Sequence, residues 1–428
     1  MGFKPVVPES SPFTLQNIPF GVVSTQQDPS PRCATAIGEH AVDLRTLSKA
    51  GFFNDTEVTE ALSQLIETLR QANLNVFAAL PSKTRTAVRE QLISALKDGS
   101  LPEESALKLS EVQSHLPVNI PDYTDFFCSL EHCQNCAPMS GGKIPENFFN
   151  SPSAYNGRAS SVIPSPSLVR RPRGVYWKPG NKEAEYGVSK LVDFELEMGY
   201  VVSKPVPYGE TMKVDDAPEH IFGFVLLNDW SSRDIQIHEM PPLGPFNSKS
   251  FGTTISPWII TLDALDAFRT APKHKTNPLE HLRFADFNRG TFDIKLAVHL
   301  ERDGQRHKLC TSNLSYLYWT PFQQLTHHAS ANCGIRTGDT MGTGTISGDG
   351  VGEDGKKYEL GCLFEATQHA TKPLKFEGGV EVGYLRDGDS VVLSAWCEDA
   401  SGNQVLGFGE CRGQLVGPNA PIKNVTNY

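Results

Sequence analysis

The spacing of hydrophobic positions divides this chain into a helix-containing N-terminal part and a strand-rich remainder. Before residue 50 the apolar runs are short and separated by turn residues, which is typical of short strands. Residues 54–98 change to helical spacing and predict two amphipathic helices. The first is marked by Val58, Leu62, Leu65, Ile66 and Leu69 behind a capping box at Asn54 and Glu57, and the second by Val88, Leu92, Ile93 and Leu96, with its end at Gly99.

Strand patterns dominate after the proline-containing segment at 116–121, which we take as a domain boundary. The chain is long for one domain, so we expect two, covering residues 1–117 and 118–428. The expected fold class is mainly β (α+β). The clearest later elements are buried strands over Ile221–Leu227, Phe292–Val298 and Val391–Trp396 and a helix over Thr320–Ala331.

Composition narrows the class of protein. Hydrophobic residues make up 39% and charged residues 21% of the chain, which is ordinary for a soluble enzyme. A formal net charge of -10 argues against nucleic acid or an anionic membrane as a partner, and no apolar run approaches the roughly 18 residues of a membrane span. The N-terminus lacks an apolar signal core and the nine cysteines suggest reduced thiols, so we expect a cytoplasmic protein.

An acidic pattern at 191–202 is the most informative stretch of the sequence. Acids alternate there with apolar residues, which predicts a half-buried strand with Asp193, Glu195 and Glu197 on one face. Like charges at this spacing repel one another unless a cation neutralises them. Because all the candidate ligand atoms are oxygens, Mg²⁺ or Ca²⁺ fits better than zinc. The plain alternative is the solvated face of an edge strand.

Further acidic residues could complete such a site. Asp229 ends a buried strand, with Arg233 and Gln236 close behind it, and Asp125 ends the segment Asp122–Asp125. Each aspartate by itself is more commonly a turn residue or a helix cap. Together with the acidic strand, however, they predict a single site for a hard cation.

His132 is the candidate general base, because the unperturbed pKa of histidine lies nearest neutrality. His327 and His328 are competing candidates on the helix predicted at 320–331. Consecutive helical residues diverge by about 100° and cannot easily converge on one substrate. We therefore interpret these two histidines as core or surface residues.

Two other patterns favour modest interpretations. Cys128, Cys133 and Cys136 have the opening spacing of an iron–sulfur site, but no fourth cysteine lies in a matching loop, so we interpret them as ordinary thiols. A reactive nucleophile at Cys133 stays an alternative. The glycine-rich run at 342–348 is followed by a loop, so it predicts a close turn beside a substrate rather than a phosphate cradle.

Longer motifs carry a family resemblance over nearly the whole chain: Gly21–Gln26, Asp122–Phe126, Tyr155–Ser161, Asp193–Glu197, Asn228–Asp234, Gly244–Phe246, Lys249–Trp258, Gln323–His328 and Gly344–Gly348. With these motifs the chain resembles the fumarylacetoacetate hydrolase family. The resemblance implies a small SH3-like N-terminal domain, a mixed β-roll C-terminal domain and a homodimer. It also implies hydrolysis of a carbon–carbon bond in a small-molecule 1,3-dicarbonyl substrate, with Mg²⁺ or Ca²⁺ binding both carbonyl oxygens.

The resemblance also implies roles for individual residues. The metal would be bound by Asp125, Glu195, Glu197 and Asp229, with Lys249 and Thr253 alongside. The general base would be His132, oriented by Glu359. Oxyanion stabilisation would come from Arg233, Gln236 and Lys249, and contacts to substrate oxygens from Tyr155 and Thr345.

Three substrate-contact positions depart from the family pattern. Phe127 and Met240 stand where the family has tyrosines, and Gly141 stands where it has arginine. Losing one cation and two hydroxyl groups weakens binding of an anionic substrate. We therefore expect a less anionic 1,3-dicarbonyl, in a specialised biosynthetic or degradative pathway. Two alternatives stay open: decarboxylation, isomerisation or carbon–carbon bond formation through an enolate, and a non-catalytic binding protein on the same fold.

Overall fold

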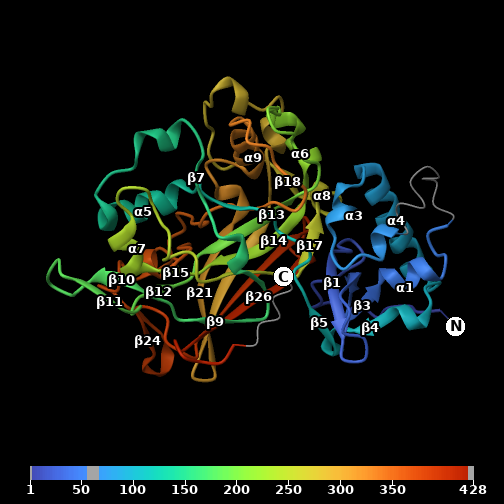
Figure 1. Cartoon of the computed structure of the whole chain (residues 1–428), viewed down its shortest axis with the longest axis horizontal. Coiled ribbons are helices and arrows are strands. Elements are labelled where there is room, and N and C mark those ends of the chain that lie inside the picture. Colours follow the sequence, from blue (N-terminus) through green and yellow to red (C-terminus); the bar gives the residue numbers. More distant parts are fainter. Residues whose placement is uncertain (1, 55–66, 423–428) are drawn as a thin grey trace.

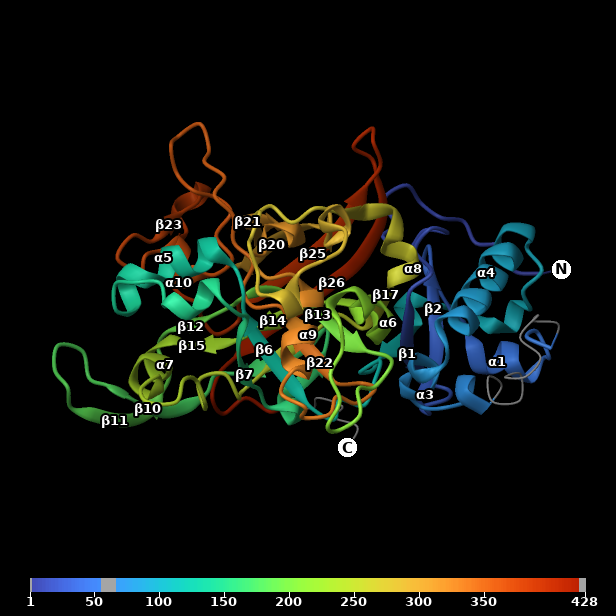
Figure 2. The same ribbon diagram turned by 90° about the horizontal axis from the view of Figure 1, so that it is seen from above.

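The computed structural model describes residues 2–54 and 67–422. A small N-terminal part lies at one end of the molecule and a larger sheet-rich part fills the rest, in both views (Figures 1 and 2). The first predicted helix and its capping box fall mainly on residues 55–66, outside the described residues. None of the described helices combines the length and apolarity that a membrane crossing requires.

The N-terminal part is a small antiparallel sheet covered by helices. Its strands are β1 (Phe20–Thr25), β2 (Arg32–Ile37), β3 (His40–Asp43), β4 (Ala106–Lys108) and β5 (Val112–Ser114), and its helices α1 (Leu44–Lys49), α3 (Asn75–Ala79) and α4 (Ser82–Asp98). Helix α4 confirms the second predicted helix, since it buries Val88 and Leu92 and ends at Gly99 with a left-handed φ of 69°.

The same sheet continues into the C-terminal part, because β1 pairs antiparallel with β17 (Trp258–Thr261). Beyond β17 the order is β14 (Ile221–Asp229), β13 (Leu196–Val202), β22 (Thr340–Gly342), β6 (Tyr123–Phe127) and β7 (Ser153–Asn156), while β16 (Thr253–Ile255) joins β14 to β8 (Val162–Pro164). The neighbouring strands β6, β22, β13, β14 and β16 thus bring distant segments of the sequence to one place.

A second sheet faces the first across the main hydrophobic core. It consists of β21 (Gln305–Asn313), β20 (Lys295–Arg302), β25 (Ser390–Glu398), β26 (Gln404–Val416) and β9 (Ser167–Arg170). Leu226 of the first sheet and Trp230, directly after β14, share this core with Leu393 and Leu415 from the second sheet. The mainly β (α+β) class is therefore confirmed.

Shorter elements surround these sheets. The two-stranded pairs are β10 (Arg173–Trp177) with β11 (Ala184–Val188), β12 (Val192–Asp193) with β15 (Ser231–Ser232), β18 (Arg269–Thr270) with β19 (Thr291–Phe292), and β23 (Leu374–Lys375) with β24 (Glu381–Val382). The helices are α5 (Leu130–Ser140), α6 (Ala217–His220), α7 (Arg233–Glu239), α8 (Leu262–Leu265), α9 (Pro321–Ala329) and α10 (Leu363–Ala366). Helix α9 confirms the helix predicted from Thr320, which forms a capping box with Gln323.

The acidic stretch differs from its prediction in two ways. It is not one continuous strand, because β12 ends at Asp193 and β13 begins only at Leu196. It is also not half-buried: every residue of β13 is buried, since this strand is central and pairs with both β14 and β22. The solvated edge strand is therefore excluded. The strand predicted over Phe292–Val298 is similarly divided between β19 and β20.

Candidate active site

Four carboxylates meet across the neighbouring strands β14, β13, β22 and β6 of the first sheet. Asp125 comes from the middle of β6, Glu197 from β13, Asp229 from the end of β14, and Glu195 from the break before β13. One carboxylate oxygen from each lies within 4.8 Å of the others, and all four residues are buried. The tertiary structure therefore assembles the four acids that were predicted to share a cation.

Asp193 does not belong to this group. Its carboxylate accepts hydrogen bonds from the backbone N–H groups of Leu363 and Phe364 at 2.7 and 2.8 Å, and from Arg233 Nε at 2.9 Å. The prediction that Asp193 shares one face with Glu195 and Glu197 is wrong, because the strand is interrupted between them. Asp193 instead anchors the start of α10 and holds Arg233 in place.

Two cationic side chains contact these acids. Lys249 Nζ donates to Glu195 and, at 2.7 Å, to Asp229 Oδ2. Arg233 Nη2 lies 2.9 Å from both Asp193 and Glu195, while its Nη1 donates to Gln236 Oε1 at 2.9 Å. Among the described residues these two cations thus pair with Asp193, Glu195 and Asp229, and no ion pair reaches Asp125 or Glu197.

Neutral donors complete the surroundings of the cluster. Asp229 accepts hydrogen bonds from Tyr155 Oη at 2.8 Å and from Thr253 Oγ1 at 3.3 Å. The Gly344 N–H donates to Glu197 Oε2 at 3.0 Å. By contrast, Asp125 Oδ1 and Glu197 Oε1 are buried and have no hydrogen-bond partner among the described residues.

The pKa values divide the cluster in two. Burial, and then the negative charge of Asp229, raises the pKa of Asp125 well above its ordinary value. Burial and the charge of Asp125 do the same to the pKa of Glu197. Burial alone would also raise the pKa of Glu195, but Lys249 and Arg233 lower it to about 2. Asp125 and Glu197 are therefore the two acids whose ionised forms lack compensation.

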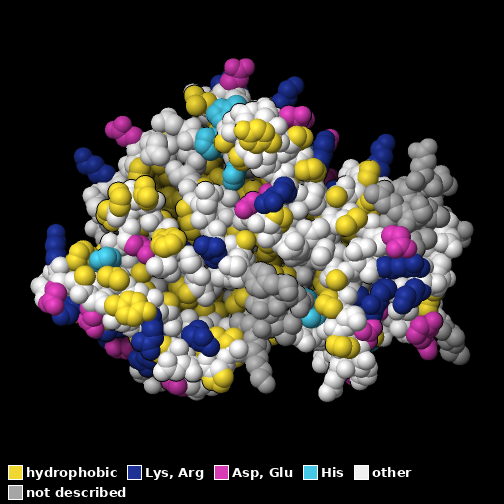
Figure 3. Space-filling model, in the orientation of Figure 1, with side chains coloured by type: hydrophobic (Ala, Val, Ile, Leu, Met, Phe, Trp, Pro, Cys, Tyr) yellow, Lys and Arg dark blue, Asp and Glu magenta, His cyan; other side chains and the backbone are white. Residues whose placement is uncertain are grey.

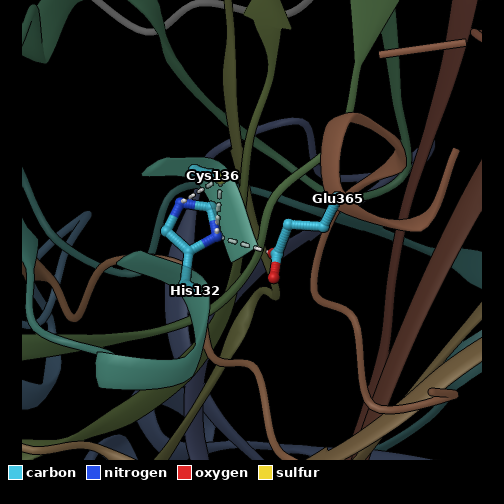
Figure 4. Close-up of side chains that lie close together, drawn as sticks. All are labelled: His132, Cys136 and Glu365. Atoms are coloured by element: carbon cyan, nitrogen blue, oxygen red, sulfur yellow. Dashed lines mark hydrogen bonds and ion pairs between the residues drawn. The ribbon is translucent and has the colours of Figure 1, made fainter. Parts of the chain in front are cut away.

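His132 lies beside the cluster, in the first turn of α5. Its backbone N–H donates to the Ser129 side chain, which caps the helix. Its Nδ1 contacts Glu365 Oε1 at 2.6 Å, from the short helix α10 (Figure 4). Although burial disfavours the charged ring, the Glu365 carboxylate raises the pKa of His132 well above its ordinary value.

The prediction that Glu359 orients His132 is wrong. The Glu359 carboxylate accepts instead from the Gly350 N–H at 2.7 Å and from Tyr316 Oη at 3.1 Å. Glu359 precedes α10 and is bound by the turn that contains Gly350, whereas Glu365 lies on α10 itself, which packs against α5. No local pattern in the sequence distinguishes these two acids.

A pocket of about 380 Å³ brings the cluster and His132 to one space. Its polar lining includes Asp125, His132, Tyr155, Glu195, Arg233, Gln236, Lys249 and Thr345, and its apolar lining includes Phe127, Phe148, Ile237, Met240, Pro245 and Phe364. Two members of the cluster, Glu197 and Asp229, do not line the pocket, nor does Thr253, which donates to Asp229. The glycine-rich run does form a close turn, since Gly344 has a φ of 78°, and the next residue, Thr345, lines the pocket.

Gly141 is not part of this pocket. It ends α5 with a φ of 127° and is exposed, and a side chain there would meet nothing within 4 Å. Of the three altered positions, Phe127 and Met240 line the pocket while Gly141 does not. The residues that sequence reasoning missed are Glu365 and the apolar walls Phe148 and Phe364. His327 and His328 also lie outside the pocket, as expected.

Comparisons with known proteins agree with this arrangement. Residues 16–117 match the model "Fumarylacetoacetase N-terminal" and residues 123–416 match "Fumarylacetoacetate (FAA) hydrolase C-terminal". The chain is 42% identical to the fumarylacetoacetase of Arabidopsis thaliana, over 97% of this chain and 98% of that protein. It is 39% identical to the fumarylacetoacetase of Homo sapiens, over 97% and 99%.

Solved structures show the same fold at much lower identity. A fumarylacetoacetate hydrolase from Exiguobacterium antarcticum superposes with a TM-score of 0.52 at 14% identity, covering 94% of this chain and 99% of that one. Fold and site together define a sheet-rich enzyme with a buried acidic centre. The chain belongs to the fumarylacetoacetate hydrolase family.

Proposed function

We propose that this protein is a metal-dependent hydrolase that cleaves a carbon–carbon bond in a 1,3-dicarbonyl compound. The observation that carries the proposal is the buried carboxylate cluster, which opens into the same pocket as His132. The names of the relatives, fumarylacetoacetases from plants and mammals, support this class of reaction.

The residues present fit a hard divalent cation. Asp125 Oδ1 and Glu197 Oε1 are buried without a partner among the described residues, and burial of such atoms costs free energy unless something binds them. The donor set contains only oxygens, which favours Mg²⁺ or Ca²⁺ over softer metals. Asp125, Glu195, Glu197 and Asp229 would hold the ion. Bound there, it would act as a Lewis acid that polarises the substrate carbonyls and stabilises enolate charge.

The side chains around the pocket supply the remaining steps. Glu365 occupies His132 Nδ1, so Nε2 is the nitrogen available to take a proton from the attacking water. Lys249 donates to Glu195 and Asp229 and faces the pocket, where its positive charge stabilises developing negative charge. Because Arg233 holds the amide oxygen of Gln236, the Gln236 NH₂ group remains to donate to a substrate oxygen.

The pocket walls favour a less anionic substrate than fumarylacetoacetate. Phe127, Phe148, Met240 and Phe364 give the pocket a largely apolar wall. An anionic group against such a wall would be desolvated without a partner, which is unfavourable. We therefore propose a neutral or bulkier 1,3-dicarbonyl, of the kind found in specialised metabolism.

Turnover tests the proposal directly. Purified protein is supplied with Mg²⁺ or Ca²⁺ and offered fumarylacetoacetate or neutral 1,3-dicarbonyls in water labelled with ¹⁸O. We expect cleavage that places ¹⁸O in the new carboxylate, faster with the neutral compounds, and lost in His132→Ala. Preference for fumarylacetoacetate would contradict the substrate class, and absence of any cleavage would contradict the reaction.

The apolar walls also favour a second candidate. Exclusion of water from such a pocket suppresses hydrolysis and permits decarboxylation, isomerisation or bond formation through the same enolate. The labelled-water experiment separates the two, because these reactions leave no ¹⁸O in a carboxylate.

We propose in addition that the protein is a homodimer. Large hydrophobic side chains are exposed around α7 and the β10–β11 hairpin, among them Trp177, Tyr186, Leu243 and Phe246, and Figure 3 shows hydrophobic side chains gathered on that side of the molecule. Exposed patches of this kind mark interaction surfaces. Light scattering after size exclusion would give twice the chain mass of 47.0 kDa for a dimer.

A further inference from the structure

A second group of potential metal ligands lies at the general base. His132, Cys136 and Glu365 each offer one ligand atom within 4.8 Å of the others (Figure 4). Cys136 Sγ lies 3.7 Å from His132 Nδ1 and 3.9 Å from Nε2. A further thiol joins them, since Cys362 Sγ lies 3.4 Å from Glu365 Oε1. The carboxylate cluster described above contains none of these four residues.

Two helices fix the positions of these ligands. His132 and Cys136 are four residues apart on α5, the separation that places two side chains on one face of a helix. Glu365 lies on α10 and Cys362 is its N-cap residue. Glu365 is held further by Asn135 Nδ2 and Ser347 Oγ, each at 2.8 Å. Such outer hydrogen bonds orient ligands in known metal sites.

The donor atoms differ in kind from those of the carboxylate cluster. One imidazole nitrogen, two thiol sulfurs and one carboxylate oxygen suit Zn²⁺, whereas an all-oxygen set suits Mg²⁺ or Ca²⁺. Tetrahedral zinc with ordinary bond lengths keeps its nitrogen, sulfur and oxygen ligands about 3.4–3.6 Å apart. The two sulfur distances of 3.7 and 3.4 Å fall near that range. The His132–Glu365 contact of 2.6 Å would lengthen as a metal ion replaces the hydrogen between them.

We propose that His132, Cys136, Cys362 and Glu365 form a Zn²⁺ site that stops catalysis when filled. With the metal on His132 Nδ1, the ring carries its one hydrogen on Nε2, which can then no longer accept a proton. The ion reaches the site through the substrate pocket, which both His132 and Cys136 line. Binding releases the two thiol protons to solvent, and the hydrogen displaced from His132 Nδ1 moves to Nε2, so the imidazole stays neutral. Inhibition rests on the function proposed above, but the metal site itself does not.

Spectroscopy of Co²⁺ tests the site without any substrate. The full-length protein is first saturated with Mg²⁺ or Ca²⁺ to fill the carboxylate cluster, and kept reduced with a phosphine. Co²⁺ should then produce a thiolate-to-cobalt charge-transfer band, and Zn²⁺ should displace it. Cys136→Ser and Cys362→Ser should each weaken Zn²⁺ binding by more than about 100-fold, beyond the loss caused by removal of an outer-shell partner.

Cys133→Ser is the matched control. Cys133 is a buried thiol on the same helix, next to His132, but it is absent from the group formed by His132, Cys136 and Glu365. This variant should keep the band and the Zn²⁺ affinity. Circular dichroism and a thiol count check that each variant is folded and reduced, and Cys136→Ala and Cys362→Ala serve as second variants.

The outcomes separate the site from the function. Absence of the band in wild type, or wild-type band intensity and Zn²⁺ affinity in both cysteine variants, would overturn the site whatever the turnover. A thiolate-bound metal that leaves turnover unchanged would overturn the inhibition. In the expected result, Zn²⁺ lowers turnover of wild type and Cys133→Ser at least tenfold more than that of either ligand variant. A bound metal with no turnover of any 1,3-dicarbonyl would refute the proposed function and leave the site standing.

Discussion

Replacement of Glu365 by glutamine tests how His132 is prepared for catalysis. Glutamine keeps the size of the side chain and an oxygen that can accept from His132 Nδ1, but it removes the negative charge. Both side chains of this 2.6 Å contact are buried, so water cannot solvate the protonated imidazole in place of the lost carboxylate charge. The variant therefore isolates the electrostatic part of the interaction.

The expected magnitude follows from the kind of bond. Hydrogen bonds to charged groups contribute about 1.5–3 kcal/mol, roughly twice as much as neutral ones. If that contribution is expressed when His132 takes up a proton in the transition state, kcat falls by about 10- to 150-fold. Because Glu365 does not line the pocket, KM should change little.

The matched control is Glu359→Gln. The Gly350 N–H and the Tyr316 hydroxyl donate to different oxygens of Glu359. In glutamine the amide oxygen can still accept from the Gly350 N–H and the NH₂ group can donate to the Tyr316 hydroxyl oxygen, so kcat should stay close to wild type. Steady-state kinetics on a cleaved 1,3-dicarbonyl would measure both variants. The reasoning is refuted if Glu359→Gln loses more activity than Glu365→Gln, or if Glu365→Gln raises KM and leaves kcat unchanged.

Three further predictions concern metal, pH and backbone. Removal of divalent metal by a chelator should abolish turnover and lower the melting temperature, and added Mg²⁺ or Ca²⁺ should restore both, because the ion offsets buried negative charge; an unchanged melting temperature after complete metal removal would contradict this. Burial lowers the pKa of His115 below its ordinary 6.5, so the folded state binds fewer protons than the unfolded state. Urea unfolding should thus show a free energy of unfolding that decreases as the pH falls from about 7.5 to 5.5. The decrease should be less steep in His115→Gln, and equal slopes for the two proteins would contradict the prediction. Gly344→Ala should destabilise the fold by more than about 2 kcal/mol, since its Cβ would lie 2.2 Å from the Phe126 carbonyl oxygen at a φ of 78°; Gly180→Ala, with a φ of 81° and open space, should cost only about 1 kcal/mol in the same unfolding assay.

Residue chemistry by itself determined part of the candidate site. Four acids with only oxygen donors predicted a hard-cation site, and Asp125, Glu195, Glu197 and Asp229 do converge. The pattern was sufficient because three of these acids lie in or directly beside strongly apolar strands. Such strands are buried, and buried acids need partners.

The prediction from alternating apolar and acidic residues was wrong where the backbone departs from a regular strand. Every second side chain of a continuous strand lies on the same face, which would place Asp193, Glu195 and Glu197 together. The interruption after β12 directs Asp193 toward Arg233 and α10 instead. The break depends on pairing with β15 and β14, which are distant segments, so no local signal reveals it.

The sequence by itself determined the family, the fold class and the four acids that converge, because motifs and hydrophobic spacing are local properties. Only the tertiary structure decided which acid serves His132. Glu359 and Glu365 are six residues apart and chemically alike, yet only Glu365 reaches His132, from 233 positions away along the chain. The path of the loop between β22 and α10 makes that choice. The same packing of α10 against α5 brings Cys136 and Cys362 to the base, an arrangement that their separation in the sequence conceals.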